Sequence, residues 1–241
     1  MDRGIWATWY DLPVDGRADY LAWLHSVYIP ALLQRPGYLW AAHYASIGTG
    51  RKVHPLHHTQ DPAVPTGNQY ILLIGAEHAH VFAAPVPTAL HAELPDADQK
   101  MLGMRVGTRT NIFAEIARVL GPEANAYREG MTLGPCIQLG SFDCAWQDEE
   151  EVLAWYAQWR MAAMETLPGV IRTRKLASVA GWAKHAVIYE WTSPAARQEY
   201  FTGHEDRAPA MKAWSARMVP RLIHAPGSSN VACRIWPEPP Q

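Results

Sequence analysis

One offset recurs along this chain, and that internal repeat limits the folds open to it more than any other feature. Three matches share an offset of 132 residues: LAW at 21–23 and 153–155, Pro-Gly at 36–37 and 168–169, and IWATWYD at 5–11 with IQLGSFD at 137–143. Three matches in one ungapped register are difficult to obtain by chance. We therefore expect two copies of one unit, residues 1–132 and residues 133–241.

Each copy shows the same order of predicted elements: strand, helix, strand, strand, helix, strand. In the first copy the patterns predict strands at 5–11, 38–46, 69–76 and 125–131, and helices at 16–34 and 96–120. In the second they predict strands at 136–144, 170–177, 184–191 and 229–236, and helices at 149–166 and 194–222. Pro36-Gly37 ends the first helix, Ser193 caps the last one, and a break is expected near Gly203.

This order is that of a ferredoxin-like unit, whose sheet carries helices on one face and leaves the other open. An open apolar face must be covered, and two fused copies can cover each other. We therefore expect an α+β fold in which two ferredoxin-like repeats form one eight-stranded, pseudo-dimeric α/β barrel. Because fusion satisfies the barrel interface within one chain, a monomer is permitted, and a homodimer stays open.

Composition narrows the function classes. The chain has 241 residues, 49% hydrophobic and 18% charged, with a formal net charge of -2, so it lacks the basic balance of a nucleic-acid-binding protein. No apolar run is long enough for a signal peptide or a membrane span, and the three cysteines show no C-x-x-C spacing. We expect a cytoplasmic protein whose partner is a small molecule. Nucleotide-binding, serine-hydrolase and zincin motifs are absent from the sequence.

Histidines cluster in the first copy, where the connection between the second and third strands carries about 17 extra residues, roughly 48–67. The cluster comprises His54, His57 and His58 in this insertion, and His78 and His80 after the third strand. Imidazole groups suit Zn, Cu, Ni or non-haem Fe, but spacing on a loop says little about geometry. A polar loop is the simpler interpretation, so we assign no metal ligands.

Aromatic residues are abundant, and Trp9, Trp23, Tyr28 and Trp40 could line a pocket for an aromatic ligand. Ordinary core packing is the competing interpretation. His43 and His185 lie on predicted central strands, where each is either a hydrogen-bonded core histidine or a base.

Two pairs of arginines are candidate anchors for an acidic group. Arg172 and Arg174 alternate along one strand and project from one face, either toward a ligand or into salt bridges. Arg105 and Arg109, together with Gly103 and Gly107, interrupt the predicted helix at 96–120. That interruption marks either a functional segment or a break between two helices.

Residues 20–44 (YLAWLHSVYIPALLQRPGYLWAAHY) resemble the signature of EthD-like members of the dimeric α/β-barrel superfamily, and residues 185–201 resemble the same superfamily. The matching positions are Trp23, Ile29, Pro30, Leu32, Pro36 and Gly37 and, more weakly, Trp155, Tyr156, Pro168, Gly169, Arg172 and Arg174. Where the family often has a histidine, this chain has Tyr28, and the second copy has Arg160. A histidine that some relatives carry near the start of the last helix corresponds most nearly to Ala210.

The resemblance implies a tandem-repeat member of a superfamily that includes monooxygenases, lactone isomerases and haem-dependent enzymes. It favours a small-molecule enzyme that oxygenates or isomerises a hydrophobic or aromatic metabolite without a cofactor. The differences between the two copies indicate that one pocket is functional and that the other was filled or reassigned. Tyr28 or His43 would act as acid or base. The predicted binding residues are Trp9, Trp23, Trp40, Arg105, Arg109, Arg172, Arg174 and His185. Two alternatives are a non-catalytic binding protein and a metalloprotein that uses the insertion; no histidine is an obvious axial ligand for haem.

Overall fold

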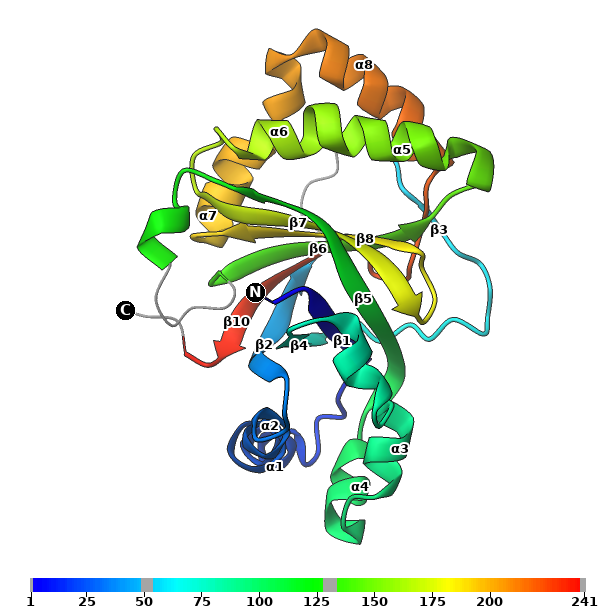
Figure 1. Ribbon diagram of the computed structural model, residues 1–241, viewed down its shortest axis with the longest axis vertical. Helices are drawn as coiled ribbons and strands as arrows, with labels where there is room; N and C mark the ends of the chain where they lie inside the picture. Colours follow the sequence, from blue (N-terminus) through cyan, green and yellow to red (C-terminus); the bar gives the residue numbers. More distant parts are fainter. Residues whose placement is uncertain (1, 49–53, 128–133, 239–241) are drawn as a thin grey trace.

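Strands that are apolar on both faces must be covered on both sides. In the computed structural model, which describes residues 2–48, 54–127 and 134–238, the strands β1 (Gly4–Asp11) and β6 (Cys136–Asp143) bury every residue except the last. One face of each strand points into a closed barrel, where Ile5, Ala7 and Trp9 pack, and the other packs against helices (Figure 1).

The barrel consists of eight antiparallel strands in the order β10-β2-β4-β1-β5-β7-β8-β6, and it closes because β6 also pairs with β10. The other six strands are β2 (Tyr38–Gly48), β4 (Tyr70–Ala76), β5 (Val106–Leu120), β7 (Val170–Ala180), β8 (His185–Trp191) and β10 (Asn230–Trp236). Two short strands, β3 (His57–His58) and β9 (Ile223–His224), pair in parallel beside β6. The fold is therefore mixed α+β, with a closed antiparallel barrel and helices outside it.

The two halves of the barrel have the same strand order. It is β2-β4-β1-β5 in the first half and β7-β8-β6-β10 in the second, and the halves meet where β5 pairs with β7 and β10 pairs with β2. In each half the third strand along the chain lies beside the first, and the fourth lies on the first strand's other side. The two halves therefore share one strand topology.

Element boundaries also repeat at the offset found in the sequence. The helix α1 (Arg17–Trp23) and the π-helical segment η1 (Leu24–Tyr28) begin and end 132 residues before α5 (Glu149–Trp155) and η5 (Tyr156–Arg160). In each half a Pro-Gly pair, 36–37 or 168–169, follows the continuous helical stretch that begins with α1 or α5, and its glycine has a φ of 80°. A residue with a side chain is strained at that φ, which explains why glycine ends both helices.

Helices cover the outer face of each half-sheet. The other helical segments of the first half are α2 (Ile29–Leu33), η2 (Ala79–Ala83), α3 (Pro87–Ala92), α4 (Asp96–Leu102) and η3 (Ala124–Tyr127). Those of the second half are η4 (Trp146–Asp148), α6 (Met161–Met164), α7 (Pro194–Ala196), η6 (Arg197–Phe201), η7 (His204–Arg207), α8 (Pro209–Met218) and η8 (Val219–Arg221). The predicted cap is confirmed, since Ser193 Oγ accepts a hydrogen bond of 3.0 Å from the amide of Ala196. The break at Gly203 is confirmed as well, at a φ of 80°.

One predicted helix is wrong. Residues 96–120 divide into the short helix α4 and the 15-residue strand β5, and β5 takes the place of the strand expected at 125–131. Part of that expected strand, and the expected boundary between the copies at 132, lie outside the described residues. Ile112, Ile116 and Val119 have helical spacing, but β5 lies between β1 and β7 and hydrogen-bonds to both. Pairing on both edges overrides the local pattern.

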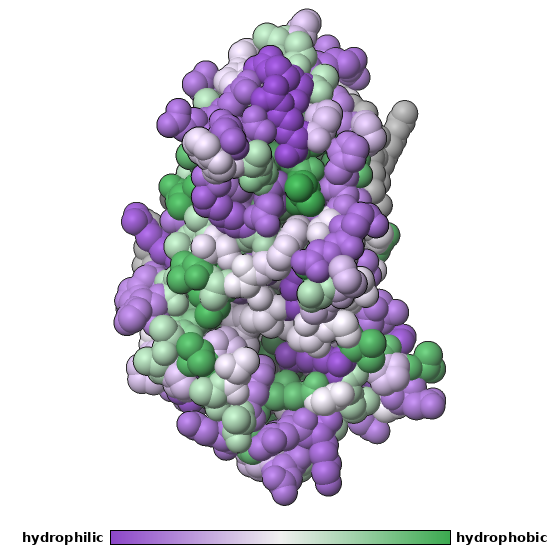
Figure 2. Space-filling model, turned by 90° about the vertical axis from the view of Figure 1, so that its right-hand side faces the viewer, coloured by the Kyte–Doolittle hydropathy of each residue, from purple (hydrophilic) through white to green (hydrophobic). Residues whose placement is uncertain are grey.

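Helices long and apolar enough to cross a bilayer are not found in the described part of the chain. On the face that Figure 2 shows, small hydrophobic areas alternate with hydrophilic ones.

Candidate functional site

A cavity of about 100 Å³ lies in the second half of the molecule, between the outer face of the sheet and the helices. It is lined by side chains from β6, β8, η5, the segment after β8 and the first-half insertion, including Gln138, Phe142, Tyr156, Arg160, Tyr189, Arg197, Phe201, His204, Glu205, His54 and Leu56. Aromatic rings form its apolar walls, and several polar groups converge on it. That combination is typical of a small-molecule site.

Alternation along β6 determines which side chains reach the cavity. Gln138, Gly140 and Phe142 line it, while Ile137 and Leu139 pack into the barrel. At the position that corresponds to Gly140, the first half has Thr8, whose hydroxyl accepts a hydrogen bond of 2.9 Å from Trp6 Nε1. The absence of a side chain at Gly140 leaves space in the second half that the first half fills.

The π-helical segment η5 places Tyr156 and Arg160 over the cavity. A π turn widens the helix locally and occurs frequently at functional sites. The equivalent segment η1 places Tyr28 over the first half-sheet, where it is buried. The last residue of the π-helical segment is therefore Arg160 in the second half and Tyr28 in the first.

His204 is the histidine best placed to act as a base in this cavity. Its Nδ1 donates a hydrogen bond of 2.6 Å to the Phe201 carbonyl oxygen, and Phe201 stacks on the imidazole at 4.6 Å. The bond fixes the tautomer, because a carbonyl only accepts, and it leaves Nε2 as an acceptor. Nε2 is buried without a hydrogen-bond partner among the described residues. Burial and the nearby Arg160 charge lower the pKa of His204 to about 4, so the ring is neutral at pH 7.

Glu205 contacts three neighbouring polar side chains. It pairs with Arg160, accepts a hydrogen bond of 2.9 Å from Ser215 Oγ and lies 3.1 Å from His54 Nε2. Burial alone would raise the pKa of Glu205. The Arg160 charge and the hydrogen bonds from His54 and Ser215 have the opposite and larger effect, so the pKa lies below its usual value. The carboxylate is therefore ionised and neutralises Arg160.

Arg197 differs from Arg160 in its partner. Its Nε and Nη2 donate hydrogen bonds of 2.9 and 2.6 Å to Gln138 Oε1, a neutral acceptor. Arg197 is 4% exposed, and burial lowers its pKa. No carboxylate is paired with it in the part of the chain that the structure describes. A buried cation with only a neutral partner favours a negatively charged group in the cavity.

The insertion of the first half reaches across to this cavity. His54 contacts Glu205, Leu56 packs against the second-half core, and His58 Nε2 lies 2.7 Å from the Ser228 carbonyl oxygen. His78 and His80 are exposed beyond β4 and stack on each other at 6.3 Å. The insertion therefore contributes part of the cavity wall.

The predicted acid and base of the first half lie in a packed aromatic cluster. The Tyr28 hydroxyl lies 2.6 Å from His91 Nε2, and His43 lies between the Tyr10 hydroxyl and His25 Nε2, at 2.8 Å from each. Burial raises the pKa of Tyr28 and lowers that of His43 well below its usual value. The structure thus places both side chains outside the second-half cavity, with hydrogen-bond partners of their own.

Four other predicted residues, Arg105, Trp23, Arg109 and Trp9, lie near this cluster or inside the barrel. Arg105 belongs to the cluster, since its guanidinium stacks on Tyr10 at 4.7 Å and donates to the Tyr20 hydroxyl. Trp23 Nε1 donates to Asp98 at 2.7 Å. Arg109 lies over the ring of Trp9 at 4.4 Å, and Trp9 packs in the barrel interior.

Arg172 and Arg174 take part in buried ion pairs. Arg172 pairs with Glu190, and Arg174, which is fully buried, pairs with Glu115 and Asp2. Asp2 also accepts a hydrogen bond of 2.8 Å from Trp40 Nε1. These salt bridges hold β7 to its neighbours, and neither arginine is among the residues that line the cavity.

His185 also lies outside the lining of the cavity. Its ring stacks on Phe142 at 5.5 Å, and it is 4% exposed.

Comparison with known proteins gives likeness in structure alone. No family model matches the chain, and no curated protein matches its sequence. An anthrone oxidase-like protein aligns with a TM-score of 0.60 and 11% identity, over 97% of this chain and 91% of that one. This structure and the two described next share the dimeric α/β-barrel fold. This chain has the dimeric α/β-barrel fold.

Two further structures support that assignment. A Lactobacillus acidophilus protein described as a putative monooxygenase aligns with a TM-score of 0.52 and 10% identity, over 98% of this chain and 94% of that one. A chlorite dismutase-like protein aligns with a TM-score of 0.54 and 14% identity, over 98% and 95%. At such identities the likeness establishes the barrel, and function must be argued from the site.

Sequence reasoning missed His204, Glu205 and Arg197. The resemblance directed attention to Ala210, six residues beyond the histidine that precedes α8. The one available signal was the break at Gly203, whose φ of 80° turns the chain so that His204 reaches the cavity.

Proposed function

We propose that the chain is a small-molecule enzyme in which His204 removes a proton from a hydrophobic, aromatic substrate and Arg197 stabilises the oxyanion that forms. One observation carries this proposal: the same cavity is lined by a neutral, buried imidazole whose Nε2 has no hydrogen-bond partner and by a buried guanidinium with no carboxylate partner, both judged within the described part of the chain. A base and a cation so arranged suit the formation of an enolate or phenolate.

The chemistry follows from these two groups. His204 Nε2 takes the proton, and the negative charge that develops on the substrate oxygen raises the pKa of the imidazole during the transfer. The enolate then reacts with O₂, which serves as oxidant; the product keeps one oxygen atom, and the other leaves as water. In an isomerisation, His204 would instead return the proton to a different carbon.

The structural neighbours support this class of reaction, since they include an anthrone oxidase-like protein and a protein described as a putative monooxygenase.

The repeated boundaries support a more detailed assignment of the fold. We infer that residues 1–132 and 133–241 are two fused ferredoxin-like repeats of an EthD-like tandem barrel. The 132-residue offset of α1 and η1 against α5 and η5 supports it, as does the common strand order. A cytoplasmic location also remains a prediction. So does a homodimer.

Anthrone and O₂ are the probes that test the proposed reaction. We expect oxygen consumption that saturates with anthrone and falls by about 100-fold or more in His204→Gln, because a lost general base typically costs 10²–10⁴-fold. Arg197→Met should show a smaller loss. The matched control is His80→Gln, which changes an exposed histidine and should retain full activity.

The same assay separates the alternatives. If His43→Ala and Tyr28→Phe abolish turnover while His204→Gln retains it, the reaction belongs to the first-half cluster that the sequence predicted. Saturable binding of anthrone or a related phenol without oxygen consumption would indicate a binding protein.

A further inference from the structure

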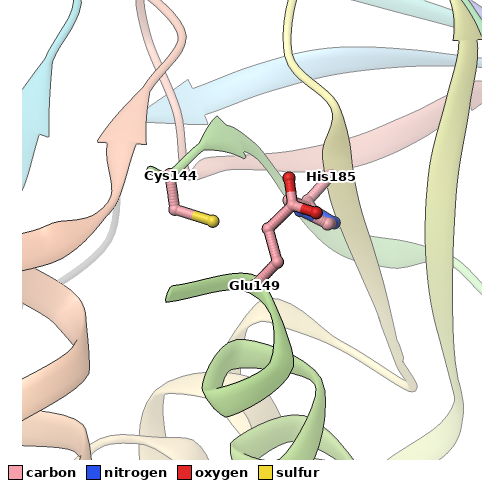
Figure 3. A group of neighbouring side chains, drawn as sticks. All are labelled: Cys144, Glu149 and His185. Atoms are coloured by element: carbon pink, nitrogen blue, oxygen red, sulfur yellow. The ribbon is translucent and has the colours of Figure 1, made fainter. Parts of the chain in front are cut away.

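Three potential metal ligands converge at one end of the second half-sheet (Figure 3). Cys144 directly follows β6, Glu149 is the first residue of α5, and His185 is the first residue of β8. One ligand atom from each, the thiol sulfur, a carboxylate oxygen and an imidazole nitrogen, lies within 4.8 Å of the other two. The three side chains come from separate elements and point toward a common centre.

His185 provides a second, independent observation. It is 4% exposed, and neither ring nitrogen has a hydrogen-bond partner among the described residues. A buried polar atom without a partner is costly, and such atoms are rare in folded proteins. Stacking on Phe142 holds the ring in place. A cation at the centre of the cluster would satisfy one of these nitrogens.

The donor set favours zinc. A thiolate, an imidazole and a carboxylate together suit Zn²⁺, which binds four ligands in a tetrahedron. Bond lengths of 2.0–2.3 Å place the ligand atoms of such a site about 3.3–3.8 Å apart. Since the three atoms lie within 4.8 Å of one another, they need to approach by about 1.5 Å at most, which side-chain rotation can provide. Three protein ligands leave the fourth position for water.

The surrounding charges permit a cation. Lys184 Nζ binds the Glu149 carboxylate, but its side chain is 55% exposed, so the pair is weak and easily exchanged. Lys175 lies nearby with its ammonium group over the rings of Phe142 and Tyr156, at 5.2 and 5.0 Å. Asp143 and Asp148 add negative charge close to Cys144.

The first half has no counterpart of this cluster. The corresponding positions hold Leu12, Arg17 and Tyr70, and these side chains do not form a zinc site. None of the three second-half ligands lines the cavity, so the cluster is separate from the proposed active site. We propose that Cys144, Glu149 and His185 form a Zn²⁺ site that joins β6, β8 and α5.

Titration of the metal-free full-length protein with Zn²⁺ by calorimetry tests the proposal. We expect one ion per chain and a rise in the thermal unfolding temperature, because a ligand that binds only the folded state stabilises it. Titration with Co²⁺ adds a spectroscopic readout, since a cobalt–thiolate bond gives a charge-transfer band. Absence of saturable Zn²⁺ binding, or a Co²⁺ complex without that band, would overturn the proposal.

Two matched pairs of variants locate the site. Cys144→Ser and Glu149→Gln should each weaken Zn²⁺ binding by more than the about 10- to 100-fold typical of a lost outer-sphere partner. Cys233→Ser, at another partly buried free cysteine, and Glu150→Gln, at the next residue, should bind as the unaltered chain does. Equal affinities within both pairs would place the ion elsewhere and refute the assignment. Circular dichroism confirms that each variant is folded.

Discussion

Arg109 is a buried charge whose removal from water is only partly compensated. It is 4% exposed, its Nε and Nη1 have no hydrogen-bond partner among the described residues, and burial lowers its pKa to about 10. Stacking on Trp9 compensates only part of the cost of removing a guanidinium group from water.

We therefore predict that Arg109→Met raises the free energy of unfolding by about 1–2 kcal/mol, as removal of a poorly compensated buried charge often does. Urea unfolding at pH 7 measures this change. Arg118→Met is the contrasting control, because Arg118 makes ion pairs with Asp2 and Glu115, and its removal should destabilise the protein. If Arg109→Met were destabilising, the guanidinium group would have a partner that stabilises it in the folded state.

At the scale of elements, the insertion between β2 and β4 is separable from the barrel. This connection has 21 residues, whereas the equivalent β7–β8 connection has four. Deletion of residues 49–65 would leave a four-residue connection and remove Leu56, the His54–Glu205 pair and the bond from His58.

We expect the shortened chain to retain the barrel and to lose about 4–6 kcal/mol of stability, because the deletion removes two apolar side chains (Leu56 and the buried Val64), the β3–β9 pairing and two side-chain hydrogen bonds. Anthrone binding should weaken by about tenfold, because the insertion contributes one wall of the cavity. Calorimetry measures both quantities. Unchanged affinity would show that the insertion has no part in binding.

Elements also show how far the sequence could predict this fold. The offset of 132 placed β1, β2, β6 and β7 correctly, because β1 and β6 match in sequence and a Pro-Gly pair precedes both β2 and β7. β5 was mistaken for a helix, since its apolar residues follow a helical spacing and only its pairing with two neighbours decides the outcome.

The candidate site was less predictable for a physical reason. The cavity forms where side chains from separate elements and from both halves meet and where Gly140 carries no side chain, and neither feature is visible in the sequence. Cys144, Glu149 and His185 likewise meet only through the fold.

Considered as a whole, the molecule buries several histidines in the neutral form. Burial, together with the charge of Arg105 or Arg160, lowers the pKa of His91 and His204 to about 4, and that of His43 lies well below its usual value. An unfolded chain binds protons at these positions below about pH 6.5, whereas the folded chain does not. Above about pH 6.5 these histidines therefore cost no stability, and the free energy of unfolding decreases as the pH falls from 6.5 toward 4.

We predict that each of His91 and His204 accounts for a loss of about 2 kcal/mol in the free energy of unfolding between pH 6.5 and pH 5. Urea unfolding at the two pH values measures it. Carboxylates contribute mainly at lower pH, since the pKa of Asp2 is about 2 and that of Glu205 lies below its usual value. His204→Gln should remove its share of the loss, whereas the exposed His80→Gln should leave the loss unchanged. A loss equal in both variants would mean that folding does not lower the pKa of His204, which would contradict the burial of its ring beside Arg160.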